Sequence, residues 1–289
     1  MLATAIVSGL SLGSIYGLIA LGFTLTFAVS GTVNFAQGSS VMLGAVTCQL
    51  LSVGMGWPTG SAIAAALVAC AIWGLIVERI AVRPFVVRGT NAWLMATVAL
   101  GIVLDNVMML LFGKEPRALP SVLADEPWVV GAVGFLPLQI FIPVLGVGLA
   151  WLLHLAMQKT SLGLKLRAAV DNPDAARLMS VNVTLLIALT YAAAAVLAGI
   201  GGIMIAPLYN VAYDMGTLFG IKAFAVAILG GLTNPGGVVI AGFAYGLVEA
   251  CATAWLGSGS TQIVTFTAVI AALALMPSGL FGGVRKARV

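Results

Sequence analysis

Charged residues are scarce in this sequence. Only 8% of its 289 residues are Asp, Glu, Lys or Arg, while 61% are hydrophobic, and the mean hydropathy is +1.14. Ordinary soluble domains have about 25% charged residues. The composition therefore excludes a typical soluble protein and indicates a chain that resides in a lipid bilayer.

Histidine and cysteine are also rare. His154 is the only histidine, and Cys48, Cys70 and Cys251 are scattered through apolar runs without any paired spacing. One histidine excludes an H-E-x-x-H zinc motif, and these cysteines form neither a disulfide framework nor a metal framework. We interpret all four residues as structural and expect no metal site.

Two further sequence features are missing. No G-x-x-x-x-G-K-[ST] phosphate loop is present, so the chain is not expected to hydrolyse ATP by that route. The first residues have no basic segment, which predicts that the first apolar run is a membrane span and not a cleaved signal peptide. A membrane enzyme or a scaffold is therefore the weakest hypothesis for the function.

Long apolar runs are what the sequence has in abundance. A spanning helix needs about 20 mostly apolar residues. We predict an all-α, polytopic membrane protein with eight or nine transmembrane or half helices and a broken second span, forming one transmembrane domain over residues 1–289. The expected segments are Leu2–Val29, Gly38–Val53, Ala62–Ile80, Trp93–Phe112, Leu138–Met157, Leu185–Pro207, Ala223–Leu232, Val238–Leu256 and Gln262–Met276.

The basic residues are placed as topology signals. Ten of the 13 Lys and Arg residues fall in three segments, which the positive-inside rule assigns to the cytoplasm. These residues are Arg79, Arg83, Arg88, Lys159, Lys165, Arg167, Arg177, Arg285, Lys286 and Arg288. The connection Gly113–Pro137 has mixed charge and is expected outside. The N-terminus is then outside too, provided that the Gly38–Val53 segment crosses the bilayer fully.

Two stripes of small residues recur at every fourth position. Gly9, Gly13 and Gly17 lie in the first run, and a late run contains Gly242, Gly246 and Ala250. On a helix each stripe forms one face that another backbone can approach closely. Packing within the subunit and packing between subunits are both consistent with this pattern.

Polar residues interrupt the apolar sequence between Ser30 and Ala45. Asn34, Gln37 and Ser39 lie there, and a second break spans Ile228–Gly242. Irregular backbone at membrane depth is tolerated where protein or a water-filled cavity satisfies it, and broken helices often line transport sites. The first break is therefore either part of a transport path or an ordinary solvated loop.

Two carboxylates lie inside apolar runs. Asp105 is followed by Asn106, and Glu249 lies three residues after Gly246. An Asp at a helix centre costs about 2.5–3.5 kcal/mol on insertion scales, so such residues face the bundle interior or an aqueous path. A structural hydrogen bond is the alternative for each, and Lys222 is a possible partner that the sequence alone cannot assign.

A polar segment, residues 158–183, separates two membrane-length runs. It predicts two short helices, Leu164–Val170 and Pro173–Met179, with Asn172 as the N-cap of the second. Asp174 and Arg177 are spaced to pair along that helix. Small apolar residues on these helices suggest a knob that docks into a groove of a cytoplasmic partner.

Four motifs in order along the chain resemble the permease subunits of bacterial branched-chain amino-acid ABC importers. They are the opening segment Gly9–Gly38, the turn ERIAVRP (Glu78–Pro84), the segment Ser161–Val183 and the tail Gly220–Gly242. The sequence departs from the family pattern with Gln37 in place of His, Ser39 in place of Glu, and Ser180 in place of Gly. Asp105 also precedes Asn106 where an uncharged amide is common.

Residues that are polar at membrane depth are expected to border the translocation path. They are Asn34, Gln37, Ser39, Asp105, Asn106 and Glu249. The resemblance, together with the position of the polar segment, implies an ATPase-coupling set of Gly163, Arg167, Ala168, Ala169, Asn172, Pro173, Ala175 and Ala176.

The resemblance also implies partners and a location. The chain would be half of a permease pair in the bacterial inner (plasma) membrane, with a second related permease, two cytoplasmic ATPases and a periplasmic substrate-binding protein. No cofactor is expected in this chain, because the partner subunits would bind the ATP. The solute would be a branched-chain amino acid or a related small solute. An ion-coupled secondary transporter, with Asp105 or Glu249 titrating, is the alternative.

Overall fold

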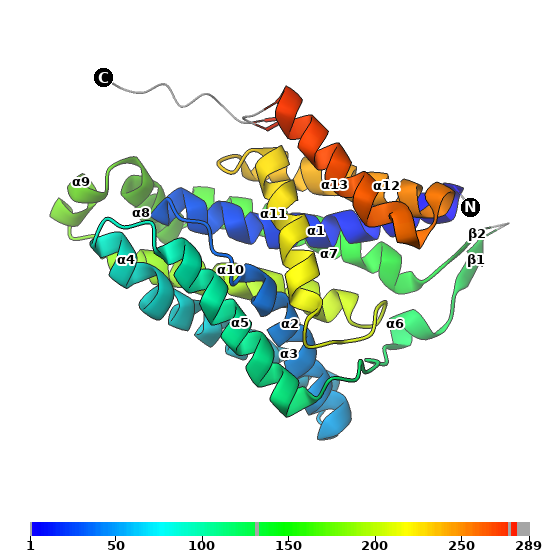
Figure 1. The fold of residues 1–289 in the computed structure, drawn as a ribbon. Helices are drawn as coiled ribbons and strands as arrows, with labels where there is room; N and C mark the ends of the chain where they lie inside the picture. The colour runs from blue at the N-terminus through cyan, green and yellow to red at the C-terminus, as the bar shows by residue number, and fades with distance from the viewer. Residues whose placement is uncertain (1, 131–132, 277–278, 282–289) are drawn as a thin grey trace.

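The computed structural model describes residues 2–130, 133–276 and 279–281 of the chain, and it is almost entirely helical (Figure 1). The basic C-terminal residues Arg285, Lys286 and Arg288 lie outside the described residues. Within the described residues, seven helices are long and apolar enough to cross a membrane. The predicted all-α, polytopic membrane fold is confirmed.

Each of the nine predicted apolar segments corresponds to a helix. The long ones are α1 (Leu2–Ser30), α3 (Thr59–Ile76), α5 (Trp93–Phe112), α7 (Pro137–Lys159), α10 (Val183–Ile205), α12 (Pro235–Leu256) and α13 (Ser258–Leu275). Two are shorter, α2 (Gln37–Gln49) and α11 (Met215–Gly230). The predicted start of α11, Ala223, was wrong. The helix begins eight residues earlier, at Met215.

Short elements link these helices. They are the π-helical turns η1 (Leu50–Gly54) and η2 (Val77–Val82), the helices α4 (Arg83–Val87), α6 (Val122–Asp125), α8 (Ser161–Asp171) and α9 (Pro173–Leu178), and the strands β1 (Trp128–Val130) and β2 (Val133–Phe135). The two strands form an antiparallel hairpin that pairs Trp128 with Phe135. The sequence analysis did not predict this hairpin.

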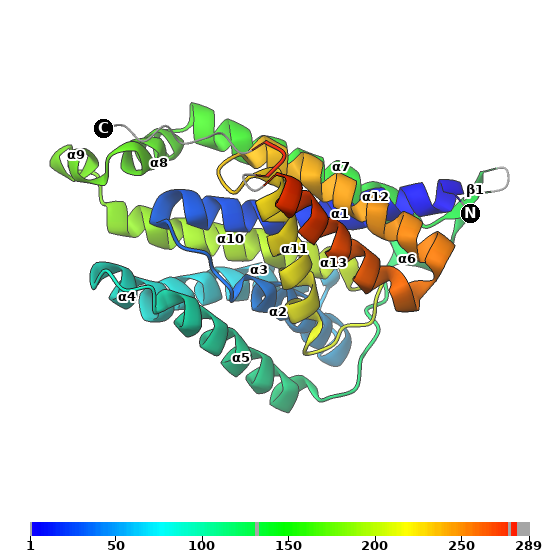
Figure 2. The same cartoon turned by 45° about the horizontal axis from the view of Figure 1, so that its top comes forward.

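The two ends of the bundle differ in what they contain. Helices α4, α8 and α9 lie together at one end, and the start of α1 and the β-hairpin lie at the other (Figures 1 and 2). Two of the three predicted basic segments therefore share one end, and the Gly113–Pro137 connection reaches the opposite one. This arrangement agrees with the charge pattern, while the side of the membrane that each end faces stays a prediction.

The two stripes of small residues meet each other. Helices α1 and α12 have the most extensive contact in the fold. A Cβ atom added to Gly13 would lie 2.6 Å from the carbonyl oxygen of Gly242, and one added to Gly9 would lie 3.0 Å from the Cβ of Ala250. Small residues on both sides are what allow the two backbones to touch. The stripes thus pack within the subunit, which was one of the two expected alternatives.

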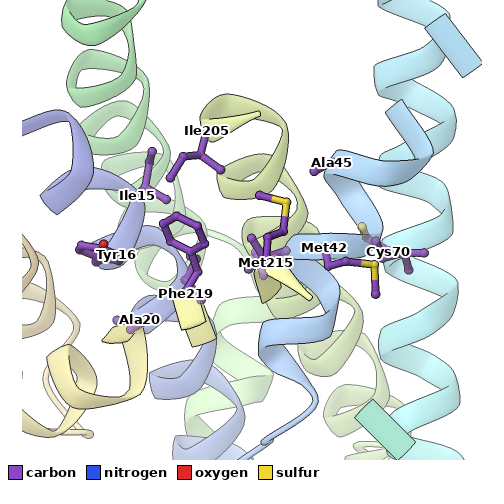
Figure 3. Close-up of a cluster of buried hydrophobic side chains, with 14 of the residues drawn as sticks. Ile15, Tyr16, Ala20, Met42, Ala45, Cys70, Ile205, Met215 and Phe219 are labelled. Carbon is purple, nitrogen blue, oxygen red and sulfur yellow. The ribbon is translucent and has the colours of Figure 1, made fainter. Parts of the chain in front are cut away.

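Helix α2 lies in the middle of the molecule. It packs against α3, α10 and α11, and its Met42 and Ala45 belong to a large buried cluster with Phe219 of α11 and Cys70 of α3 (Figure 3). Its 13 residues span only about 20 Å, less than the roughly 30 Å hydrocarbon core of a bilayer. To cross the bilayer, this part of the chain also needs the non-helical residues before α2 and the η1 turn after it. This agrees with the prediction that the second span is broken.

Candidate translocation site and coupling segment

A cavity of about 300 Å³ lies beside the start of α2. Its wall comes from α1, α2, α5 and α11, together with Phe35 of the break that precedes α2. The lining residues are Phe23, Phe35, Gly38, Ser39, Val98, Gly101, Ile102, Asp105, Thr217, Gly220, Ile221 and Phe224. The cavity thus brings together residues from the helix break and from one of the two intramembrane carboxylates.

Asp105 is the acidic residue of the cavity wall. Its Oδ2 atom accepts a hydrogen bond from the Thr217 hydroxyl at 3.3 Å. Its Oδ1 atom is buried and has no hydrogen-bond partner among the described residues. The Ser39 hydroxyl lies near enough to interact with the same carboxylate. Of the six predicted path residues, Ser39 and Asp105 are the two that line this cavity.

Sequence reasoning missed the other lining residues of α5 and α11, although a pattern could have located them. On α5, positions 98, 101, 102 and 105 form one helical face, and on α11, positions 217, 220, 221 and 224 form another. Both sets follow the i, i+3, i+4, i+7 spacing of a single helix face. Extending a stripe from Asp105 along α5 predicts the four lining residues that this helix contributes.

Asn34 and Gln37 are at the start of α2 but are not among the cavity-lining residues. The Asn34 Oδ1 atom accepts from the backbone N–H of Ala36 at 3.1 Å. The fully buried Gln37 side chain donates from Nε2 to the carbonyl oxygen of Ala194 at 2.8 Å. These bonds satisfy the irregular backbone at membrane depth and attach the start of α2 to α10.

Asn106 lies outside the cavity as well. It is exposed on α5, and its side-chain amide donates to the carbonyl oxygen of Ile102 at 2.8 Å within the same helix. One helical position separates it from Asp105, which is enough to turn it to a different face. The structure therefore separates this pair of adjacent polar residues.

Glu249 lies in a packed polar cluster and not on the cavity wall. Its Oε1 atom is 2.5 Å from the Lys222 ammonium, and both side chains are almost completely buried. Lys222 also donates to the Tyr16 hydroxyl at 3.4 Å and lies over the Tyr16 ring. The ion pair joins α11 to α12 against α1. Lys222 is thus the partner that the sequence left unassigned.

The motif ERIAVRP forms a bidentate ion pair just after the end of α3. Both oxygens of the buried Glu78 carboxylate accept from the Arg83 guanidinium, at 2.9 and 2.8 Å. The paired geometry fixes orientation as well as charge. It holds α4 against the π-helical turn η2.

The polar segment of residues 158–183, the candidate coupling segment, folds into the two predicted helices, α8 and α9. The Asn172 side chain caps α9 by accepting from the backbone N–H of Ala175 at 3.0 Å, as expected. Arg177 pairs with Asp174 at 3.1 Å on the exposed surface, also as expected. Arg167 bonds to the carbonyl oxygen of Gln158 at 3.2 Å, which ties α8 back to α7.

The expected apolar knob consisted of six residues, namely Ala168, Ala169, Ala175, Ala176, Leu178 and Met179. Four of them are exposed, but Ala169 and Ala176 are buried. Ala169 and Ala176 are 1% and 4% exposed and pack in an internal cluster with Leu166. Gly163 is buried too, where a Cβ would collide with the last carbonyl groups of α7. The outward apolar residues are Leu178 and Met179, at 87% and 79% exposed. Ala169, Ala176 and Gly163 hold the segment together from within.

Ser180 follows α9 with a φ of 61°. This left-handed conformation suits glycine and is unfavourable for residues with a Cβ. This backbone conformation explains why glycine, the residue of the family pattern, fits at position 180 better than the serine of this chain.

Comparison with known proteins places the chain in a family. Residues 5–276 match the family model described as branched-chain amino acid transport system / permease component. The chain belongs to this family. It is a permease subunit of an ABC transporter and a multi-pass protein of the inner membrane. The family consists of transport proteins and not of enzymes. The ion-coupled alternative does not fit this membership.

Individual relatives cover almost the whole chain. The high-affinity branched-chain amino acid transport system permease protein LivH of Escherichia coli K12 is 30% identical over 95% of this chain and 94% of its own length. The corresponding protein BraD of Pseudomonas aeruginosa is 31% identical over 96% of this chain and 94% of its own. The galactofuranose transporter permease protein YtfT of E. coli K12 is 29% identical over 76% of this chain and 62% of its own. No solved structure matches this chain.

Proposed function

We propose that this permease subunit forms half of the solute pathway of an importer and that the cavity beside α2 is part of that pathway. The observation that supports this proposal is the position of the cavity. It lies where the second span is broken, between α2, α5 and α11, and its wall includes hydroxyl groups and a carboxylate at membrane depth. Transport sites at broken helices have this character.

The proposed solute is a branched-chain amino acid or a related small polar or amphipathic molecule. The printed names of LivH and BraD support the amino acid. The name of YtfT indicates that a related permease serves a sugar, so membership alone leaves the solute open. The cavity volume suits a small molecule.

The proposed assembly contains four kinds of subunit. A second related permease would complete the pathway, two cytoplasmic ATPases would bind and hydrolyse ATP, and a periplasmic binding protein would deliver the solute. This chain has no phosphate loop of its own, which supports assigning ATP binding to partner subunits. No cofactor is proposed for this chain.

We assign ATPase docking to the exposed surface of α8 and α9. This surface carries Arg167, Ala168 and Ala175 together with the protruding pair Leu178 and Met179. Two large apolar side chains that protrude next to charged ones suit insertion into a groove of a partner. Asn172 and Pro173 shape the start of α9, and the buried residues Gly163, Ala169 and Ala176 maintain the shape of the surface.

Replacing Leu178 with Asp tests this assignment. Leu178 has almost no internal contact, so the permease should fold normally while substrate-stimulated ATP hydrolysis by the purified complex falls at least about ten-fold, the cost of an apolar anchor at an interface. The matched control is Met55→Asp, another exposed apolar site (68%) at the far end of α3 from α4. Normal stimulation in Leu178→Asp, or equal loss in the control, would overturn the docking assignment.

A further inference from the structure

The cavity wall contains a single ionisable side chain. Asp105 is acidic, and the other lining residues are apolar or glycine apart from the hydroxyl residues Ser39 and Thr217. A solute that enters this cavity therefore meets a carboxylate and no basic side chain from the described residues. The electrostatic preference of the cavity is set by this one group.

The carboxylate has a free acceptor atom. Thr217 donates to Oδ2, but Oδ1 is buried without a hydrogen-bond partner among the described residues. Leaving a buried acceptor unpaired costs about 1–3 kcal/mol, more for a charged group. A hydrogen-bond donor on the solute would remove that cost. The cavity is thus complementary to a solute that carries a donor group.

The charges around the cavity favour a cationic donor. Asp214, just before α11, is close enough for its charge to act on Asp105. The nearest cation on α11, Lys222, is turned away and paired with Glu249. Arg117 in the outer connection lies over the Phe112 ring. No lining cation therefore offsets the negative field of Asp105 and Asp214.

Aromatic rings form the remainder of the site. Phe224 lies between two other rings, with centroids 5.5 Å from that of Phe23 and 5.2 Å from that of Phe35. Aromatic faces attract cations and also provide apolar contact area. A solute with a cationic group next to an apolar body would satisfy both the carboxylate and the rings.

Building on the proposed function, we infer that Asp105 is a specificity-determining residue that binds the protonated amino group of the solute. The three phenylalanines hold the apolar side chain of the same solute. The substrate class is then small apolar molecules with an ammonium group, which includes branched-chain amino acids and excludes their counterparts without nitrogen. This selection acts in the permease, in addition to any selection by a binding protein.

A cysteine reporter in the cavity measures its charge directly. Cys48, Cys70 and Cys251 are replaced, and Val98→Cys is introduced on the cavity wall in the complete transporter complex in nanodiscs. The reaction rates of a trimethylammonium and a sulfonate methanethiosulfonate reagent of similar size are compared. Asp105→Asn should lower the ratio of the cationic to the anionic rate about ten-fold, because one charge several ångströms away in a water-filled cavity attracts one reagent and repels the other by an amount of this order.

A charge-preserving variant sharpens the experiment. In the double variant Asp105→Asn, Asn106→Asp the carboxylate moves one position along α5, to the exposed face. The net charge stays the same, so a general electrostatic effect would leave the ratio unchanged. We expect the double variant to lose the preference for the cationic reagent to the same extent as Asp105→Asn.

Protection of the reporter identifies the ligand chemistry. Leucine should slow labelling of Val98→Cys, whereas 4-methylpentanoate, which has the same apolar chain but no amino group, should not. The Asp105→Asn variant should abolish protection by leucine. An unchanged reagent ratio in Asp105→Asn, or equal protection by the two solutes, would overturn the inference.

A parallel measurement separates this inference from the proposed function. ATP-driven uptake by the unmodified complex is followed with saturating solute-loaded binding protein. If no solute is taken up, the proposed function fails, whatever the reporter shows. If uptake proceeds but Asp105→Asn leaves the reagent ratio and leucine protection intact, the inference alone fails.

Discussion

The two carboxylates at membrane depth, Asp105 and Glu249, look alike in the sequence and have opposite surroundings in the structure. Each carboxylate has one oxygen without a hydrogen-bond partner among the described residues, but Asp105 is the one that borders the cavity. Glu249 pairs with Lys222 in the packed region between α1, α11 and α12. Both residues lie in apolar helices and both were expected on the path. What distinguishes them is the presence of a partner cation within reach.

Helix α11 takes part in both environments. Its cavity face consists of positions 217, 220, 221 and 224. Lys222 and Phe219 point instead into the packed interior, where Phe219 stacks near Tyr16 (Figure 3). A single helix therefore separates the cavity wall from the buried ion pair. The stability and the transport function of the protein should respond to different faces of this helix.

The largest expected effect is on the packed face. Lys222→Met leaves the Glu249 charge buried and unpaired, which typically costs about 3–5 kcal/mol. The variant should show a clear loss of thermal stability of the purified complex. Asp105→Asn, measured alongside, should change the stability by less than about 1 kcal/mol, because no buried partner loses its counter-charge. Similar losses in the two variants would contradict the distinction between the two carboxylates.

A smaller loss is expected in the small-residue contact between α1 and α12. Gly13→Ala places a Cβ 2.6 Å from the Gly242 carbonyl oxygen, so the helices must move apart at a cost of about 1–3 kcal/mol. The matched control is Gly148→Ala on α7, where an added Cβ has no neighbour within 4 Å. Thermal unfolding should separate the two variants. If Gly148→Ala proved as harmful as Gly13→Ala, the loss would reflect helix substitution in general and not this contact.

The smallest expected effect is on the cavity face. Thr217→Val removes the hydrogen bond to Asp105 but keeps the shape of an exposed side chain. The free energy of unfolding should change by no more than about 0.5 kcal/mol, the usual range for exposed substitutions. The Val98→Cys reagent ratio should stay within about two-fold, because the charge remains. A stability loss as large as that of Lys222→Met would mean that the cavity wall is part of the packed core.

Local patterns were sufficient to predict much of this fold from the sequence. Runs of apolar residues located the nine apolar helices that correspond to the predicted segments, because a span requires an apolar stretch. Asn172 followed by proline located the start of α9 through capping chemistry. The two stripes of small residues were recognised as contact surfaces, although the sequence could not show that they contact each other.

Tertiary geometry was needed for the remainder. Ala169 and Ala176 resemble surface residues of a small apolar knob in the sequence, yet they face inward, because Leu166 and the start of α10 cover them. The partner of Glu249 is 27 positions away in the chain. Gln37 was expected on the path, and its actual partner is a backbone carbonyl of α10. Contacts of this kind depend on how separate helices pack, which single-helix periodicity does not encode.

The two-faced character of α11 has a consequence for engineering and for divergence within the family. Side chains at positions 217 and 221 are exposed on the cavity face, whereas position 224 also packs against the buried cluster and position 222 anchors the helix from its other side. A library randomised at positions 217 and 221 would sample new solute preferences on a scaffold that continues to fold. New transport specificities could therefore arise on this helix by small steps, without compensating changes elsewhere in the bundle.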